Sequence, residues 1–330
     1  MTTGSTDRKI DKMIHLLAKN AMVVVPGPKI ASEIGVTRST VWMWVKKLRE
    51  LGVEIKGYPA TGYQMLKIPD ILVPSLIRAE LGESGIGHSI VHYFRTDSTN
   101  STALNLAQQG AVHGTVVVAE DQTAGRGRLG RSWYSEKSSG IYASVILRPP
   151  FSPAAAPILT LLAGAAAAQA LNKVTGLNVD IRWPNDLLVN GKKVCGILTE
   201  MNAELGRLHV VVLGIGINVN HTVIPAEIEP VATSLRIESR RTWSRVQILI
   251  ALLKELERHY RLLLERGSSA IAEHWAAAST YANGKRIRIV RADGESFATT
   301  TGLDSSGALR VRYEDGHEET LVAGEIVEVK

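Results

Sequence analysis

Apolar residues near the start of the chain recur every three or four positions, which is the spacing of one buried helix face. They predict a first helix, a short second helix over residues 29–34 that stops at Gly35, and a third helix with Thr37 as its N-cap. The apolar positions of the first and third helices are Ile10, Met13, Ile14, Leu17, Val41, Val45 and Leu48. Two helices joined by a turn that contains glycine are typical of a helix-turn-helix.

Two segments with strand-like composition follow the third helix. Val53–Ile55 and Gly62–Leu66 flank a loop over residues 56–61, which predicts a two-stranded wing. We therefore expect a winged helix-turn-helix domain over residues 1–66. The alternative at this point is a three-helix packing module that does not contact DNA.

The middle of the chain alternates strand-like runs with helical ones between Ile90 and about Val219. One helix is predicted after Ser98 and one through the alanine-rich stretch 153–174, and a long amphipathic helix is predicted over 245–266. Strands are predicted at 141–147, 179–182, 187–189, 194–201 and 209–219. Asn190-Gly191 is a hairpin turn signal, and hairpins require antiparallel pairs, so we expect an α+β domain with a mixed sheet.

The end of the chain alternates apolar and polar residues in short runs. Strands are predicted at 285–291, 296–302, 308–313, 318–322 and 325–329. Five short strands in so little sequence indicate a small SH3-like β-barrel over residues 282–330. The central domain is then expected over residues 79–281, after a connector over 67–78 that carries two prolines.

Composition restricts the class of protein. The 330 residues are 45% hydrophobic, which fits two or three domains with ample cores. We see no apolar run of membrane length and no signal peptide, so we expect a cytoplasmic protein with no membrane partner. The single Cys195 excludes an internal disulfide and is expected to be a small apolar strand residue rather than a nucleophile. The nine histidines show no ligand spacing, so no protein metal site is predicted.

The net charge of +6 is placed unevenly. Residues 1–66 hold ten Lys or Arg residues against five Asp or Glu residues, and thus carry +5 of the total. A local basic surplus favours a phosphate backbone as partner. On its own, however, such a surplus is more often a solvated face.

The run Gly125-Arg126-Gly127-Arg128-Leu129-Gly130-Arg131 places three arginines on a backbone with three glycines. Glycine brings backbone N–H groups close to a ligand, and arginine offers a planar fork of donors to phosphate or carboxylate oxygens. The loop follows the predicted strand 115–120, so it lies where a ligand pocket often opens. The alternative is an Arg/Gly-rich disordered or nucleic-acid-binding segment.

The same loop, with four further motifs in order along the chain, resembles the bifunctional type of biotin protein ligase that is also a biotin operon repressor. The four further motifs are Asp97–Asn100, Arg182–Asp186, Gly191–Leu198 and Gly214–Asn218. The resemblance covers nearly the whole chain, because the predicted N-terminal and C-terminal domains also fit this type. It implies a central ligase domain of the biotin/lipoate ligase type.

The resemblance implies an ATP-dependent biotin–protein ligase. In this chemistry the carboxylate of biotin attacks the α-phosphate of ATP to give biotinoyl-5'-adenylate and pyrophosphate, and a lysine of the biotin carboxyl carrier protein then displaces AMP. ATP with Mg²⁺ and biotin are the implied ligands. The implied partners are the carrier protein, operator DNA, and a second copy of the chain when adenylate is bound.

Site residues carry over from the family one at a time. Those implied for biotin are Ser98, Thr99, Asn100, Gln122, Arg126, Gly127, Arg128, Tyr142, Ser144, Lys193 and Gly196. Those implied for ATP are Arg128, Arg131, Trp133, Asn185, Lys193 and Asn218.

Lys193 is the residue expected to be catalytic, because its charge can meet both the carboxylate and the α-phosphate. Its neighbour Lys192 is expected to be an ordinary lysine of the turn, exposed to solvent. Arg126 and Arg128 are expected to close the loop over the reacting groups, and Asp186 is the remaining candidate. An Asp in this position after a proline is also an ordinary turn residue.

Two departures from the family pattern affect these expectations. Arg182 stands where lysine is commonest, which puts a direct ligand role for this residue in doubt. In the third helix, Trp42, Met43 and Trp44 stand where polar base-reading side chains are expected. The residues expected to contact DNA are Arg38, Ser39, Thr40, Trp42, Lys46 and Lys47.

Two other functions compete with the bifunctional one. In the first, the ligase-like domain serves only as a biotin sensor for transcription, and the intact loop with Lys193 disfavours it. In the second, the protein is a lipoate-type ligase, and the arginine-rich loop with Trp183-Pro184-Asn185-Asp186 disfavours that.

Overall fold

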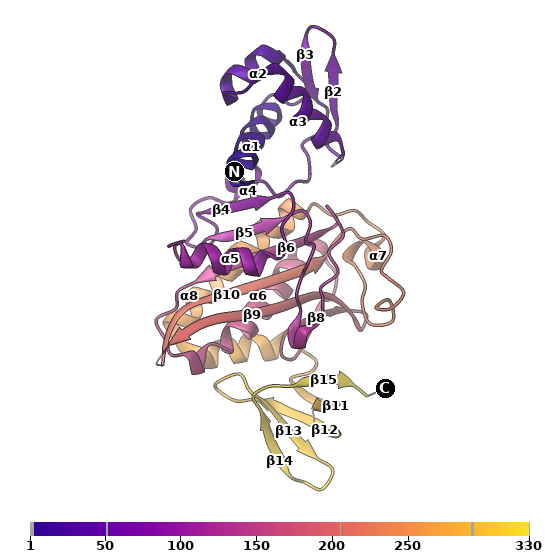
Figure 1. Ribbon diagram of the computed structural model, residues 1–330. Coiled ribbons are helices and arrows are strands. Elements are labelled where there is room, and N and C mark those ends of the chain that lie inside the picture. The colour runs from indigo at the N-terminus through magenta and orange to yellow at the C-terminus, as the bar shows by residue number, and fades with distance from the viewer. Residues whose placement is uncertain (1–2, 51, 205, 292–293, 330) are drawn as a thin grey trace.

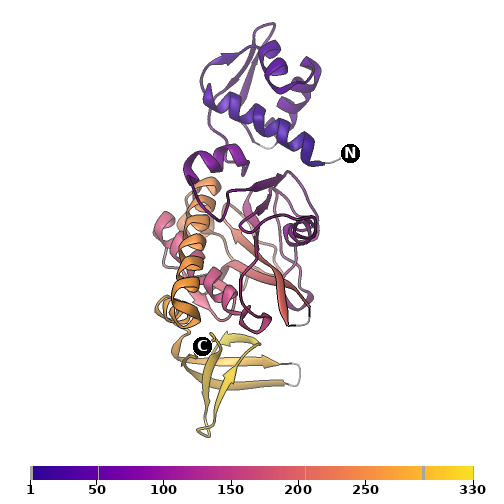
Figure 2. The ribbon, with the colours of Figure 1, turned by 90° about the vertical axis from the view of Figure 1, so that its left-hand side faces the viewer.

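Three units lie end to end in the computed structural model, which describes residues 3–50, 52–204, 206–291 and 294–329 (Figure 1). The N-terminal and C-terminal units lie at opposite ends of a larger central unit, as the perpendicular view also shows (Figure 2). We propose 1–66, 79–281 and 282–330 as the three domains, with 67–78 as a connector.

The N-terminal unit is the expected winged helix-turn-helix. It contains α1 (Thr3–Lys19), α2 (Gly27–Ile34), α3 (Arg38–Glu50) and a sheet of β1 (Val24–Val25), β3 (Gly62–Met65) and β2 (Ile55–Tyr58). Gly35 ends α2 in a left-handed conformation, and the Thr37 hydroxyl accepts a hydrogen bond from the backbone N–H of Thr40 at the start of α3. The prediction of a loop over 56–61 was wrong in part, because the β2–β3 ladder continues to the pair Tyr58–Gly62.

The central unit contains the expected mixed sheet, in the order β4-β5-β6-β10-β9-β8-β7. Its strands are β4 (Ile90–Tyr93), β5 (Val116–Ala119), β6 (Gly140–Leu147), β7 (Asp180–Arg182), β8 (Asp186–Val189), β9 (Lys192–Glu204) and β10 (Arg207–Asn218). The pair β4–β5 is parallel and the other neighbours are antiparallel. The predicted hairpin is confirmed at Asn190 and Gly191, which both have positive φ.

Helices cover both faces of this sheet. On one face, α5 (Thr99–Gln108) packs Ala103 and Ala107 against Val117 of β5 and Val212 of β10. On the other face, α6 (Ile158–Thr175) and α8 (Arg245–Ala277) pack on each other and on neighbours that include Val116 and Val118. Because successive side chains of β5 point to opposite faces of the sheet, this strand contributes to the hydrophobic cores on both faces.

The alanine-rich helix corrects one expectation. We expected no apolar run of membrane length, yet the stretch Pro153–Thr175 is long and apolar enough to cross a membrane by length and composition. Most of this stretch is buried inside the protein, where α6 packs on α8 and on the sheet. Its apolar surface therefore belongs to the core, which explains why the helix is apolar all round.

Two further boundaries differ from the predictions. The expected connector contains the first turns of α4 (Pro74–Leu81), because proline is well accommodated at the start of a helix. The long helix α8 runs past the predicted end at 266 to Ala277, with a break at Gly267 where φ is 77°. A short helix, α7 (Leu235–Ser239), precedes it.

The C-terminal unit confirms the β-rich expectation. It contains β11 (Asn283–Arg291), β12 (Gly294–Leu303), β13 (Leu309–Tyr313), β14 (Glu318–Leu321) and β15 (Glu325–Glu328). They form an antiparallel sheet in the order β14-β13-β12-β11-β15. Among the described residues no ladder joins the edge strands β14 and β15, so the backbone pairing of the expected barrel is open there.

A buried ion-pair network joins the connector to the central unit. Arg245, at the start of α8, is 1% exposed and donates to the carboxylate of Glu120 at 2.8 Å and to that of Asp70 in the connector at 3.1 Å. Glu120 is fully buried and also accepts from the backbone N–H of Leu72. Burial would raise the pKa of Glu120, but Arg245, His92 and this N–H outweigh burial and lower the pKa to about 2.

Replacing Arg245 with Met is expected to destabilise the protein by about 3–5 kcal/mol at pH 7, because Glu120 would be left buried without its cation. In the native protein the pKa of Glu120 lies below its ordinary 4.5, so its stabilising contribution is present above that pH and is lost as the pH falls towards about 2. The difference in the free energy of unfolding between Arg245→Met and the native protein should therefore become smaller as the pH falls from 4.5 towards about 2. Denaturant titrations at several pH values measure this difference. The matched control is Arg261→Met: the Arg261 side chain is 64% exposed where it pairs with Glu257, so this pair is expected to contribute less than about 1 kcal/mol. Equal losses in the two variants would contradict the prediction.

Candidate functional site

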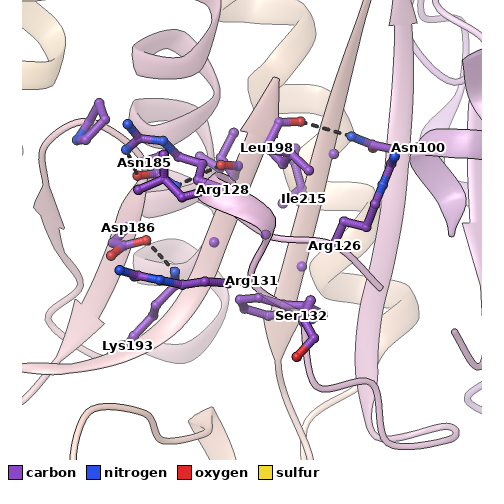
Figure 3. Close-up of a pocket in the computed structure, with 18 of the residues that line it drawn as sticks. Asn100, Arg126, Arg128, Arg131, Ser132, Asn185, Asp186, Lys193, Leu198 and Ile215 are labelled. Atoms are coloured by element: carbon purple, nitrogen blue, oxygen red, sulfur yellow. Dashed lines mark hydrogen bonds and ion pairs between the residues drawn. The ribbon is translucent and has the colours of Figure 1, made fainter. Parts of the chain in front are cut away.

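One cavity lies on the sheet between the glycine- and arginine-rich loop, the turn before β8, and the start of β15 (Figure 3). The residues expected from the sequence that line it are Ser98, Thr99, Asn100, Gln122, Arg126, Gly127, Arg128, Arg131, Trp133, Tyr142, Asn185, Asp186, Lys193 and Gly196. Two expected residues, Ser144 and Asn218, are buried just outside this lining.

Glycines form the floor of the cavity. Gly216 of β10 pairs with Gly196 of β9 in the sheet, and the indole of Trp133 lies over both. A Cβ atom at Gly216 would lie 2.5 Å from the Trp133 ring, and one at Gly196 would lie 2.7 Å from it. Two neighbouring strands must therefore lack side chains at this level for the indole to lie flat on the sheet.

The strand pairing also places a polar residue on each side of this glycine floor. Tyr142 of β6 pairs with Gly216, and Asp186 of β8 pairs with Gly196. The four residues thus form one row across four strands. The separate motifs of the sequence are adjacent because β6, β10, β9 and β8 are neighbours in the sheet.

One end of the cavity is uncharged and rich in fixed hydrogen-bonding groups. Gln122 Oε1 accepts from the backbone N–H of Thr99 at 2.8 Å and from its hydroxyl at 3.1 Å. Ser144 lies behind them and donates to Asn100 Oδ1 at 2.6 Å. Asn100 in turn fits over Gly214, where any Cβ atom would lie 2.2 Å from its Oδ1. Ser144 and Gly214 therefore orient Asn100.

The arginine-rich loop is a tight hairpin. The N–H of Gly127 donates to the carbonyl of Arg131 at 2.7 Å, and the N–H of Trp133 donates to that of Gly125 at 2.8 Å. Leu129 at the tip is 78% exposed and has φ 55°, an unfavourable conformation for a residue with a side chain. The predicted loop is therefore held by its own backbone hydrogen bonds.

Each arginine of the loop has a partner from a distant segment. Arg126 donates to both oxygens of Glu200 at 3.0 and 2.8 Å. Arg128 donates to Asn185 Oδ1 at 2.9 Å and to a carbonyl at residue 324 at 3.0 Å. Burial lowers the pKa of Arg128, which means that its charge is incompletely compensated inside the protein.

The C-terminal unit contributes to the site through Glu325 of β15. Arg131 donates to both carboxylate oxygens of Glu325, at 3.0 and 2.6 Å. Glu325 and Ile326 also line the cavity. These residues and Glu200 were not predicted, because nothing in the local sequence around 200 or 325 indicates which arginine each carboxylate will meet.

Lys193 and Asp186 form a charged pair in the cavity, and Figure 3 shows both of them near Arg131 of the loop. Lys193 Nζ lies 2.5 Å from Asp186 Oδ1, and Arg182 donates to Asp186 Oδ2 at 2.7 Å. Burial would raise the pKa of Asp186, but Lys193 and Arg182 outweigh burial and hold the pKa below its ordinary range. Asp186 is thus a carboxylate that restrains Lys193, and Arg182 contacts Asp186.

Two buried polar atoms near the floor lack hydrogen-bond partners among the described residues. They are the indole Nε1 of Trp133, a donor, and Oδ1 of Asn218, an acceptor. The amide nitrogen of Asn218 donates to the carbonyl of Thr233 at 3.0 Å, which fixes the orientation of its oxygen. Unpaired buried groups of this kind are costly unless a ligand satisfies them.

Cys195 is fully buried in β9, and burial raises the pKa of its thiol to about 12, so a thiolate nucleophile is not formed there at neutral pH. Among the described residues there is no group of three or more His, Cys, Asp or Glu side chains arranged to hold a metal ion.

The candidate DNA-contacting residues lie on α3, but not all on one face. Arg38, Ser39, Trp42 and Lys46 are exposed, and Thr40 is half-buried. Lys47 instead extends towards the central unit, where its Nζ lies 4.4 Å from the centre of the Phe94 ring. The two tryptophans also separate, because Trp42 is 60% exposed whereas Trp44 is buried in the core of the N-terminal unit.

Comparison with protein families covers all three units. Residues 93–218 match the biotin/lipoate A/B protein ligase family, residues 9–64 match an HTH domain, and residues 283–327 match the biotin protein ligase C-terminal domain.

Two relatives align with this chain over nearly their whole length, and a solved structure aligns with most of it. The bifunctional ligase/repressor BirA of Bacillus spizizenii is 37% identical, and the alignment covers 94% of this chain and 96% of that protein. The bifunctional ligase/repressor BirA of Escherichia coli is 29% identical over 96% of this chain and 95% of its own. The solved structure of the Aquifex aeolicus biotin protein ligase in complex with biotin and ATP is 29% identical with a TM-score of 0.63, and covers 73% of this chain and 98% of its own.

Proposed function

The chain belongs to the family of bifunctional ligase/repressors, and we propose from this that it joins biotin to a carrier protein and represses transcription of biotin genes. The observation that carries the ligase function is the charge of the cavity. Five cations line it, namely Arg126, Arg128, Arg131, Arg182 and Lys193, against the two acids Asp186 and Glu325. The lining therefore carries more positive than negative groups, although Glu200 compensates Arg126 from outside the lining, and such a cavity is suited to hold two anions together.

The reaction needs such a cavity because both reactants are negative. The carboxylate oxygen of biotin attacks the α-phosphorus of ATP, the bond to the β-phosphate breaks, and pyrophosphate leaves. The amine of a carrier lysine then attacks the acyl carbon, loses a proton and displaces AMP. Positioning and electrostatic stabilisation supply most of the catalysis of phosphoryl and nucleotidyl transfer, so no nucleophile from the protein is required.

Lys193 is the proposed catalytic residue. It is held by Asp186 over the glycine floor, with Nζ 5.5 Å from the centre of the Trp133 ring. Because Asp186 is shared with Arg182, part of its charge is compensated without Lys193. We propose that Lys193 turns towards the carboxylate and the α-phosphate when they enter, with Arg126 and Arg128 on the loop side.

Biotin is proposed to occupy the uncharged end of the cavity. Its ureido group has one carbonyl acceptor and two N–H donors, which need fixed partners of both kinds. The side chains of Ser98, Thr99 and Gln122 and the row behind them, Asn100 and Ser144, offer such partners. Their mutual hydrogen bonds support a rigid pocket that is formed before the ligand enters.

The nucleotide is proposed to lie between Trp133 and Asn218. A purine can stack on the indole, and the unpaired Nε1 of Trp133 and Oδ1 of Asn218 offer a donor and an acceptor. Asn185, Arg128 and Arg131 would face the phosphates. Mg²⁺ would be held chiefly by the triphosphate, because the acids nearest the cavity are already paired with arginine or lysine.

Repression is the second activity. It is supported by the helix-turn-helix with its surplus of five positive charges. We propose that adenylate favours a homodimer that binds a two-fold operator. A cytoplasmic location is proposed because the protein needs ATP, a carrier protein and DNA. The sensor-only and lipoate-ligase alternatives are disfavoured by the cationic cavity and by the biotin-ligase relatives.

The direct test of the ligase function uses the full chain with biotin, Mg-ATP and a carrier domain. Mass spectrometry should show an increase of one biotin on the carrier and none on the same domain with its acceptor lysine replaced by arginine. An increase with lipoate but not with biotin would overturn the proposal. No increase with either would favour the sensor.

Replacing Lys193 with Ala is expected to slow adenylate formation roughly a hundredfold or more, because a positioned charge that stabilises the transition state is lost. Pyrophosphate release at saturating biotin and ATP measures this rate. The matched control is Lys192→Ala, because Lys192 pairs with Glu229 at the surface instead of facing the cavity. A rate for Lys193→Ala within a few-fold of the control would exclude the catalytic role.

DNA affinity of the full chain is expected to rise with biotin plus ATP, because a ligand that favours the dimer also favours two-site binding. It should fall steeply with salt, since bound phosphates release counterions. Binding to promoter DNA of biotin genes and to random DNA can be compared by fluorescence anisotropy at several salt concentrations. Equal affinity for both DNAs with biotin and ATP present would count against the repressor function.

A further inference from the structure

The exposed face of α3 carries a regular stripe of side chains. Ser39, Trp42, Met43 and Lys46 follow the i, i+3, i+4, i+7 spacing of one helix face and are exposed. The opposite face, with Val41, Trp44, Val45 and Leu48, is buried in the core of the N-terminal unit. In Figure 1, α3 lies beside β2 and β3 in the unit at the far end from the C-terminus.

The middle of this stripe is apolar. Trp42 is 60% exposed and Met43 is 54% exposed, although burial of either side chain would be favourable. The neighbouring hydroxyls of Ser39 and Thr40 both lie 2.8 Å from the Thr37 hydroxyl that caps the helix. The hydroxyls of Ser39 and Thr40 are therefore engaged at the helix cap, and Trp42 and Met43 are the apolar side chains that a partner would meet.

A recognition helix lies in the major groove of DNA, where its N-terminal residues contact base edges. Bidentate recognition of guanine or adenine requires Arg, Lys, Asn or Gln, whereas apolar side chains suit the C5-methyl group of thymine. We propose that this protein selects its operator through thymine methyl groups contacted by Trp42 and Met43. This inference rests on the proposed operator binding and names what the helix reads.

Charge supports DNA rather than a protein as the occupant of this stripe. Arg38 precedes the two apolar residues and Lys46 follows them, and both are exposed. The whole unit carries ten basic residues against five acidic ones. An apolar stripe flanked by cations matches a groove that has methyl groups on its floor and phosphates along its edges.

The test starts from a DNA library with a random core, selected on the full chain with biotin and Mg-ATP. The preferred duplex is then made twice, once with thymine and once with deoxyuridine, which lacks only the methyl group. Loss of one buried methyl group should weaken binding about three- to fivefold for each contacted base. The Trp42→Ala and Met43→Ala variants should lose this preference for thymine at different base positions.

Val23→Ala is the matched control, because Val23 is equally exposed at 58% but lies outside α3. This variant should show the same difference in affinity between the thymine duplex and the deoxyuridine duplex as the native chain. If the native chain selects a sequence but binds both duplexes equally, this inference is wrong while operator binding stands. If the native chain selects no sequence, the repressor proposal fails and the inference fails with it. If Trp42→Ala changes only the oligomeric state of the protein in solution, the stripe is a protein interface and the inference is also wrong.

Discussion

Repulsion between like charges is the constraint on which this structure depends. The proposed site for two anions needs several cations around one cavity, and those cations repel each other when no ligand is present. Here they are held apart by partners from different segments: Glu200 holds Arg126, Glu325 holds Arg131, and Asp186 holds Lys193. The loop, the sheet and the C-terminal unit are thereby joined at the cavity.

The cavity itself exists because side chains are missing from the middle of the sheet. Gly196 and Gly216 are neighbours on β9 and β10, and Gly214 lies two residues before Gly216 on the same face. A methyl group at any of them would overlap Trp133 or Asn100. Loss of strand propensity at three positions is compensated by the large hydrophobic core on the other face of the sheet.

The N-terminal unit is fastened to the central unit rather than tethered by a free linker. Phe94, Ile71 and Val73 belong to the hydrophobic core of the winged helix-turn-helix, and the Arg245 network fixes residues 70–72. Glu120 in this network lies two residues before Gln122 of the cavity. The segment that follows the winged helix-turn-helix and the segment that carries Gln122 of the cavity therefore meet at the ion pairs of Arg245.

The sequence alone predicted most of the elements and the candidate chemistry, but not β1, α4 or α7. Apolar periodicity predicted the helices and strands because each element must bury one face, and the run of glycine and arginine around Arg128 predicted an anion site because few other residues combine those properties. The residues expected to line the cavity do line it, apart from Ser144 and Asn218.

The tertiary structure alone decided what each group faces. It separated exposed Trp42 from buried Trp44, turned Lys47 towards Phe94, and brought Glu325 to Arg131 across 194 residues. Local sequence specifies local periodicity and residue chemistry, whereas partners distant in the chain depend on strand order and domain packing, which no local pattern encodes.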